Sequence, residues 1–204
     1  MKIILASTSP RRQQLLKDIG FNFEIHQPTS VELEIQGESP KKMVSRLALE
    51  KAENVAGRIL GKKESLIIAA DTTVVSPDGK KTLGKPVDAS DAVKILRSIS
   101  GRTHRVYTAY CLLLVSNKKI KKKWSAVVET KVKMRKLTAA QIKNYVRSGE
   151  PMDKAGAYGA QGIGMCLIES IQGSYTNVVG LPMSELVEDL KAQFKIAPNW
   201  DLKK

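Results

Sequence analysis

The stretch SLIIAADTTVV, residues 65–75, constrains the fold more than any other part of this chain. It is short and almost wholly apolar, which is typical of a strand buried on both faces of a sheet. Two polar residues, Asp71 and Thr72, interrupt it. A buried carboxylate is costly unless it is paired, hydrogen-bonded or bound to a metal ion. Asp71 is therefore either a chemically active group or a structural residue that caps a neighbouring turn.

A second signal comes from the start of the chain, where the apolar residues MKIIL lead directly into ASTSPRRQQLL. Ser9 is a typical N-cap residue, Pro10 fits the first helical position, and the leucines that follow recur at helical spacing. The pattern predicts a strand, a tight loop and a helix. A helix N-terminus attracts anions, and this one also carries hydroxyl groups and two arginines, Arg11 and Arg12. The alternative is an ordinary capped helix with solvated arginines.

The rest of the chain predicts a mixed α/β fold without the regular strand–helix alternation of a Rossmann fold. The segment DKAGAYGAQGIG is too rich in glycine for a regular element, CLIESIQGSYTNVVGLP predicts strand, turn and strand, and the tail from residue 195 is expected to be loose. Helical periodicity covers residues 41–60, with Gly61 as its stop, 89–101, about 138–149 and 182–194, and two long strands are predicted near 104–115 and 124–135.

Bulk properties narrow the function classes. A chain of 204 residues is most simply one domain, or two lobes that share a sheet. No apolar run is long enough for a transmembrane helix and no signal-peptide pattern is present, so we expect a cytoplasmic protein. Cys111 and Cys166 both lie in apolar sequence and are expected to be small buried hydrophobes without a disulfide. His26 and His104 have no spacing that matches a zinc site.

The net charge of +14 favours polyanionic ligands such as nucleotides. One dense lysine cluster, NKKIKKKW at residues 117–124, is predicted to be a solvated loop between the two long strands. The same charge leaves open a basic nucleic-acid-binding or division-regulating protein. Few aromatic residues are present and none is interleaved with the basic ones, as a single-strand stacking surface requires. Nucleic acid is therefore the less favoured partner.

Several loops carry further candidate groups. Glu32 and Glu34 point to the same side of an extended VELEI segment, where either could join Asp71 around a hard cation such as Mg²⁺ or remain solvated. Lys85 lies between a glycine and a proline, which suits a fixed cation. The glycine-rich loop offers backbone N–H groups beside Gln161. Neither Walker A, G-x-G-x-x-G nor G-x-S-x-G is present.

Seven blocks in order resemble the Maf family of nucleoside triphosphate pyrophosphatases, and they run from residue 3 to about 190. The blocks are ASTSPRR, RLALEKA, AADTTVV, GKP, SGRTHRVYTA, YVRSGEPMDKAGAYGAQG and GSYTNVVGLP. The resemblance implies a Maf/Ham1-like α/β fold, with a twisted mixed sheet and flanking helices that form two lobes around a deep cleft in one domain spanning 1–204. It also implies a homodimer that uses Mg²⁺ or Mn²⁺ to hydrolyse a nucleoside triphosphate to the monophosphate and pyrophosphate.

The resemblance also implies roles for individual residues. The family's general base or metal ligand falls on Asp71 and its second acidic residue on Glu32, while Glu34 has no counterpart. Its helix lysine falls on Lys51 and its triphosphate-contacting lysine on Lys85. The phosphate-binding loop falls on Ser7, Ser9, Arg11 and Arg12.

The family has at least two specificity branches, and three positions distinguish them. Arg11, Thr72 and Gln161 match the branch that acts on dTTP, UTP and related modified pyrimidine nucleotides. The branch that acts on 7-methyl-GTP typically has tryptophan, glutamine and glutamate there. Gln161 matches a residue thought to read the base, and an amide can both donate to and accept from a uracil edge. An amide could also pair with other bases.

Overall fold

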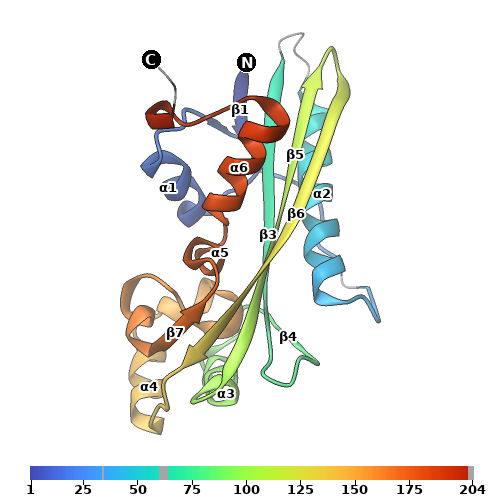
Figure 1. Cartoon of the computed structure of the whole chain (residues 1–204). Coiled ribbons are helices and arrows are strands. Elements are labelled where there is room, and N and C mark those ends of the chain that lie inside the picture. Colours follow the sequence, from blue (N-terminus) through green and yellow to red (C-terminus); the bar gives the residue numbers. More distant parts are fainter. Residues whose placement is uncertain (34, 60–63, 202–204) are drawn as a thin grey trace. The chain divides into compact units, whose positions relative to one another are not determined.

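The computed structural model describes residues 1–33, 35–59 and 64–201, and its strands form a mixed sheet with flanking helices (Figure 1). The predicted α/β class is therefore confirmed. The strand order is β2-β1-β3-β5-β6-β7, and β4 pairs with β3. The chain divides into two compact units. Unit 1 comprises Met1–Asp71, Thr108–Val127 and Gly180–Lys204, and unit 2 comprises Thr72–Tyr107 and Val128–Val179.

Unit 1 is built around parallel strands. β1 (Lys2–Leu5) pairs in parallel with both β2 (Glu24–Ile25) and β3 (Ser65–Val75), and Leu5 lies opposite Ile68. Figure 1 shows α1 and α6 on one side of these strands and α2 on the other. Residues 66–70 of β3 are fully buried, as expected for a strand covered on both faces. The helices are α1 (Pro10–Asp18), α2 (Pro40–Arg58) and α6 (Met183–Phe194).

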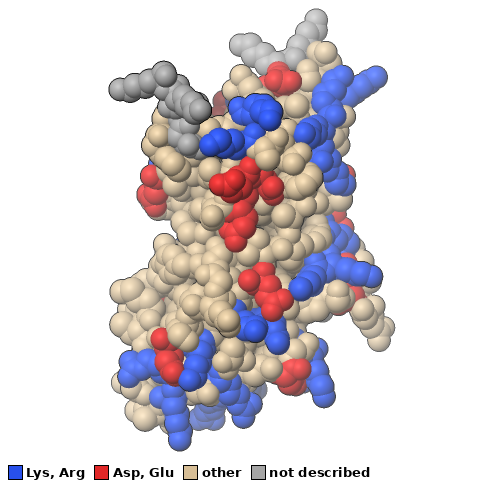
Figure 2. All heavy atoms as spheres, in the orientation of Figure 1, with Lys and Arg blue, Asp and Glu red and all other residues tan. Residues whose placement is uncertain are grey.

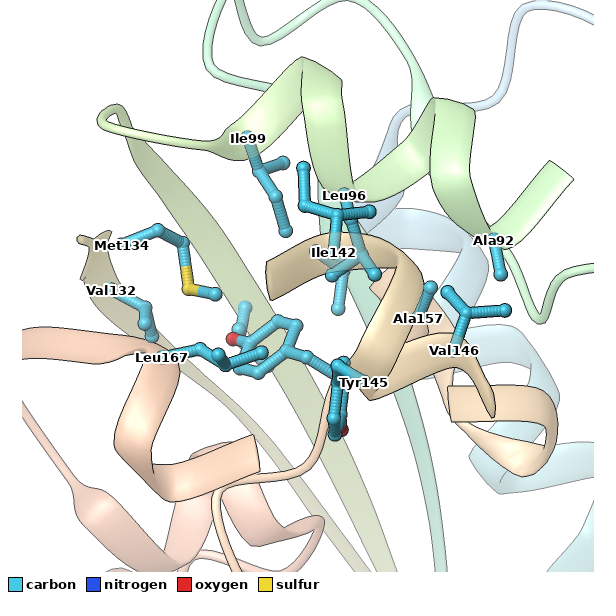
Figure 3. Packing of buried hydrophobic residues seen from close by; sticks show 13 residues of the cluster. Ala92, Leu96, Ile99, Val132, Met134, Ile142, Tyr145, Val146, Ala157 and Leu167 are labelled. Carbon is cyan, nitrogen blue, oxygen red and sulfur yellow. The ribbon is translucent and has the colours of Figure 1, made fainter. Parts of the chain in front are cut away.

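In unit 2, two helices pack against those parts of the long strands that belong to this unit. α3 (Ala89–Ile99) and α4 (Ala139–Arg147) contact one another, and Figure 3 shows Leu96, Ile142 and Met134 within one buried apolar cluster. The other elements are β4 (Thr82–Leu83), β7 (Ile168–Gln172) and α5 (Tyr175–Val179), together with the 3₁₀ helices η1 (Glu150–Asp153), η2 (Ala155–Ala157) and η3 (Gly162–Leu167).

The lysine cluster was expected to be a loop, and this prediction is wrong. β5 (Thr103–Ser116) and β6 (Lys119–Met134) are joined by a turn of only two residues, Asn117 and Lys118. Both have positive φ, which suits the primed turns that join right-twisted strands. Most of the cluster therefore lies in β6 itself. Figure 2 shows basic side chains spread over the visible face among acidic ones, without one continuous basic patch.

Other local predictions need smaller corrections. The expected second strand after Gly173 is the short helix α5, and the glycine-rich segment forms 3₁₀ turns. Ser9 occupies the N-cap of α1 without a side-chain cap bond, and its own N–H donates to Ser7 Oγ instead (3.2 Å). Cys166 is exposed, unlike the buried Cys111. Gly61 and Glu34 lie outside the described residues.

The tail is attached more firmly at its start than predicted. Lys195 ends α6 in the left-handed conformation, and the Ile196 N–H donates to the Leu190 carbonyl (3.2 Å). Residues Asn199–Asp201 form a 3₁₀ turn, η4, and residues 202–204 lie outside the described part of the chain.

Candidate active site

The carboxyl end of β1 lies beside the middle of β3, and these two strands lead to the first site residues. The Ala6 N–H donates to the Ile68 carbonyl (2.8 Å), so Ser7 follows β1 close to the point where β3 approaches Asp71. In parallel strands the carboxyl ends lie at one edge of the sheet, where α/β proteins commonly bind ligands. Ser7 is buried, and α1 begins three residues later. The expected strand–loop–helix is therefore confirmed.

Lys51 of α2 joins the two predicted acidic residues. Its Nζ donates to Asp71 Oδ1 (2.6 Å) and lies 2.7 Å from Glu32 Oε1. The side chains of Lys51 and Asp71 are 13% and 10% exposed, whereas that of Glu32 is 56% exposed. The compensating partner that a buried Asp71 requires is thus an ammonium group, and the structure brings together three residues that are distant in sequence.

Arg12 of α1 is anchored beside the loop after β1. Its Nε donates to the Gly180 carbonyl (2.8 Å), and its Nη1 donates to Ser7 Oγ (3.3 Å). Burial lowers the pKa of the Arg12 guanidinium. The negative charges of Asp71 and Glu32 raise this pKa, and the positive charge of the neighbouring Arg11 lowers it. An arginine stays protonated in any such environment. The guanidinium is therefore a fixed positive charge within the field of both carboxylates.

The chemistry of these donors fits a divalent cation. Mg²⁺ takes one or two protein carboxylates and completes its shell with water and phosphate oxygens. Asp71 and Glu32 supply two carboxylates that face a single point, where the Lys51 ammonium now lies. Within residues 1–33, 35–59 and 64–201, no larger group of His, Cys, Asp or Glu side chains is arranged to hold a metal ion.

The predicted residues of unit 2 lie on separate elements. Thr72 follows Asp71 on β3 and is half-buried. Lys85 is exposed just after β4, but its backbone is held on both sides, because Pro86 is buried and the Gly84 carbonyl accepts from the Gly156 N–H (3.1 Å). The GKP segment is thereby tied to the glycine-rich loop. The binding roles of Thr72 and Lys85 stay predictions.

Gln161 occupies the N-cap position of η3 with an exposed side chain. The backbone N–H groups around it are not open to a ligand in the way the sequence suggested. Ile163 and Gly164 both donate to the Glu150 carboxylate (2.8 Å each). Lys154 also turns inward, since its Nζ donates to the Glu150 carbonyl (2.6 Å). Sequence reasoning missed Glu150, although it lies within one of the seven blocks.

Glu150 is a strongly stabilised carboxylate. Burial alone would raise its pKa, but hydrogen bonds from the N–H groups of Gly164 and Ile163 and from the Tyr145 hydroxyl, together with the charge of Lys154, lower it below its ordinary value. The only cue in the sequence was its position directly after Gly149, in a block otherwise noted for its glycines.

Comparison with known proteins places these residues in context. A model of the Maf-like protein family matches residues 2–193. The dTTP/UTP pyrophosphatase of Carboxydothermus hydrogenoformans is 49% identical over 191 residues, covering 94% of this chain and 98% of that protein. A protein of the same name from Clostridioides difficile is 43% identical over 197 residues, covering 96% and 97%.

Among solved structures, the Ham1 protein of Staphylococcus aureus aligns with 98% of this chain and 93% of its own, at 15% identity and a TM-score of 0.40.

Among the described residues, every helix is too short or too polar to span a bilayer.

Proposed function

This chain belongs to the Maf-like protein family, and from this premise we propose that it hydrolyses dTTP and UTP to the monophosphate and pyrophosphate. The observation that carries the proposal is the convergence of Asp71 and Glu32 on Lys51, close to Arg12 and the Ser7 hydroxyl to which Arg12 donates. Relatives that match nearly their full length carry the name dTTP/UTP pyrophosphatase. The alternative of a nucleic-acid-binding protein is not favoured.

In the proposed reaction, Asp71 orients a water molecule and accepts its proton as the oxygen attacks the α-phosphorus. The bond from that phosphorus to the bridging oxygen breaks, and pyrophosphate leaves with the bond's electron pair. Such transfers depend on positioning and on stabilising charge at the transferring and leaving groups. Arg11, Arg12 and Lys51 supply positive charge in unit 1.

The family resemblance assigns a divalent cation, Mg²⁺ or Mn²⁺, to Asp71 and Glu32. When bound, such a cation polarises phosphate oxygens and lowers the pKa of bound water. Ser7 and Ser9 are proposed to contact phosphate oxygens, and Lys85 to contact the triphosphate. Thr72 and Gln161 are proposed to set the preference for the pyrimidine base. These roles follow the family pattern residue by residue.

The first experiment is pyrophosphate release from dTTP, UTP, CTP, ATP, GTP and 7-methyl-GTP with Mg²⁺ or Mn²⁺. We expect release mainly from dTTP and UTP, and a fall of about 10²–10⁴-fold in Asp71→Asn, because the proton acceptor is lost. Asp18→Asn is a matched control, since Asp18 is an exposed residue of α1 that accepts a helix-surface bond from Gln14.

Three results would contradict parts of this proposal. Full turnover in folded Asp71→Asn would exclude its assigned role, and a preference for 7-methyl-GTP would overturn the base specificity alone. No hydrolysis of any nucleotide, together with DNA binding that weakens steeply with salt, would favour the nucleic-acid alternative.

We further propose that the protein is a cytoplasmic homodimer and that each chain is one domain. Light scattering tests the dimer.

A further inference from the structure

The carboxylate of Glu150 organises the segment that carries Gln161. Its Oε1 accepts hydrogen bonds from the Gly164 N–H (2.8 Å) and the Tyr145 hydroxyl (2.9 Å), and its Oε2 accepts from the Ile163 N–H (2.8 Å). The carboxylate thus fills the turn of N–H groups that a bound anion would otherwise occupy. The residue acts as an internal anion for this loop.

Close packing around Glu150 and Tyr145, together with backbone contacts within the loop, accounts for the three glycines near Gln161. A Cβ on Gly162 would lie 2.6 Å from Glu150 Oε2, and one on Gly159 would lie 3.2 Å from Oε1. A Cβ on Gly164 would lie 2.6 Å from the Tyr145 hydroxyl and 2.4 Å from the Gly159 carbonyl oxygen. The backbone therefore wraps closely around Glu150 and Tyr145, and contact distance excludes side chains at these positions; at Gly162 the positive φ of 68° disfavours them as well.

Glu150 and Tyr145 together fix both ends of the short segment from Gly159 to Gly164. The Tyr145 hydroxyl accepts from the Gly159 N–H (3.1 Å) while it donates to Glu150, which in turn holds Gly164. Residue 160 is held separately, because its carbonyl accepts from the Tyr175 hydroxyl (3.2 Å). The backbone is thus anchored on both sides of Gln161, whose side chain is exposed, as is that of Ile163.

We propose that Glu150 is a positioning residue that sets base selectivity by fixing the backbone from which Gln161 reads the pyrimidine edge. The inference rests on the proposed function, since it assumes that Gln161 contacts the base. Uracil presents an acceptor at the position where cytosine presents an amino donor. Telling them apart requires the amide of Gln161 to approach that edge from a fixed direction.

The charge of Glu150 is required as well as its shape. Gln at position 150 keeps the size, but its NH₂ group faces a backbone N–H or a hydroxyl that also needs an acceptor. One of the three donors then loses its acceptor, which weakens the hold of position 150 on the loop. Glu150→Gln is consequently the most informative substitution.

The experiment compares kcat and KM for UTP and CTP in the wild type, Gln161→Ala, Glu150→Gln and the double variant. We expect each single variant to lower the UTP-to-CTP ratio of kcat/KM about tenfold, mainly through a higher KM for UTP. The double variant is expected to lose no more than Gln161→Ala alone, because both changes remove one function. Glu169→Gln is the matched control, since Glu169 forms a half-exposed pair with Lys133.

Amide hydrogen exchange gives a second readout that does not depend on turnover. The N–H groups of Ile163 and Gly164 should exchange faster in Glu150→Gln than in the wild type, and at the wild-type rate in Glu169→Gln. If Glu150→Gln does not fold, Tyr145→Phe removes the link to Gly159 without removing the carboxylate, and a smaller loss of the UTP-to-CTP ratio is expected.

The outcomes separate this inference from the proposed function. A wild type that prefers UTP, together with folded variants that lose kcat equally on both nucleotides at an unchanged ratio, overturns the positioning role and leaves the enzyme assignment intact. Additive losses in the double variant also overturn it. A wild type that hydrolyses no nucleotide refutes the proposed function itself, and the exchange data then report only on the loop.

Discussion

Replacing Lys51 by methionine tests whether this ammonium is what stabilises Asp71. The substitution keeps the length of the side chain and removes its charge. Asp71, only 10% exposed, then faces Glu32 without a cation between them. Breaking a buried pair typically costs about 3–5 kcal/mol, and the half-exposed Glu32 places this case near about 3 kcal/mol. For a chain of this size that corresponds to a fall in Tm of roughly 6–12 °C.

The same variant predicts a response to added divalent cations. With the ammonium gone, Mg²⁺ or Mn²⁺ can take its place between the two carboxylates, so the cation should recover part of the lost stability. Saturation to about ten times Kd gives about 1.4 kcal/mol. The wild type should gain less, because Lys51 competes for the same oxygens. A Lys51→Met protein that responds to Mg²⁺ no more than the wild type would refute this competition.

Unfolding of unit 1 can be followed by the fluorescence of Trp124. Its indole N–H donates to Asp189 (2.6 Å), whereas Trp200 is 69% exposed and should change little. Lys123→Met is the matched control, because Lys123 lies 3.8 Å from Glu53 in a half-exposed pair that is worth less than about 1 kcal/mol. Equal Tm values for Lys51→Met and the wild type would show that Asp71 is stabilised by something else.

Three further changes have defined outcomes. Arg12→Lys keeps the positive charge but loses hydrogen bonds that the guanidinium makes, such as that to the Gly180 carbonyl. The KM for UTP in steady-state assays should therefore rise about tenfold in Arg12→Lys, and further in Arg12→Ala. Burial lowers the pKa of His104 from 6.5 to about 4, so the unfolded state takes up the proton at a higher pH than the folded state does. The free energy of unfolding should therefore fall by about 3 kcal/mol as the pH drops from 6.5 to 4. Urea unfolding at several pH values should show a weaker pH dependence in His104→Gln. Asp189→Ala leaves the buried hydroxyl of Tyr110 without its acceptor and should cost about 1–3 kcal/mol in chemical denaturation, more than Tyr110→Phe.

Regular elements could be predicted from the sequence where the signal is local. The capping box of Thr138 and Gln141 is present at the start of α4, and β6 alternates buried Thr130 and Val132 with exposed lysines, both as expected. Such patterns depend on a few neighbouring residues and on the period of a helix or strand. They survive folding because tertiary contacts reinforce them.

The lysine cluster failed as a prediction because charge was taken as a sign of a loop. A two-residue turn needs only residues that tolerate positive φ, and Asn117 is one of them. The lysines that follow belong to a part of β6 outside its pairing with β7, which begins at Lys131. Charged residues, lysine above all, are common on exposed strand edges, where they oppose unwanted strand pairing.

The candidate site was predicted in composition but not in connectivity. The sequence pointed to Asp71 as a carboxylate in need of a partner, yet nothing in the spacing says that Lys51, twenty residues earlier, provides it. Glu150 was missed for another reason, since two of its partners are backbone N–H groups, which leave no mark on sequence. The glycines beside Gln161 were visible, but their cause was not.

The use of those N–H groups by Glu150 changes where phosphate charge can be neutralised. A glycine-rich loop whose amides at 163 and 164 already bind a carboxylate does not supply them to a triphosphate. Positive charge must then come from side chains, and in unit 1 these are Arg11, Arg12 and Lys51. Lys51 cannot satisfy two carboxylates and a phosphate at once. Binding of a divalent cation to Asp71 and Glu32 and release of the Lys51 ammonium toward substrate should therefore be coupled, so that each strengthens the other.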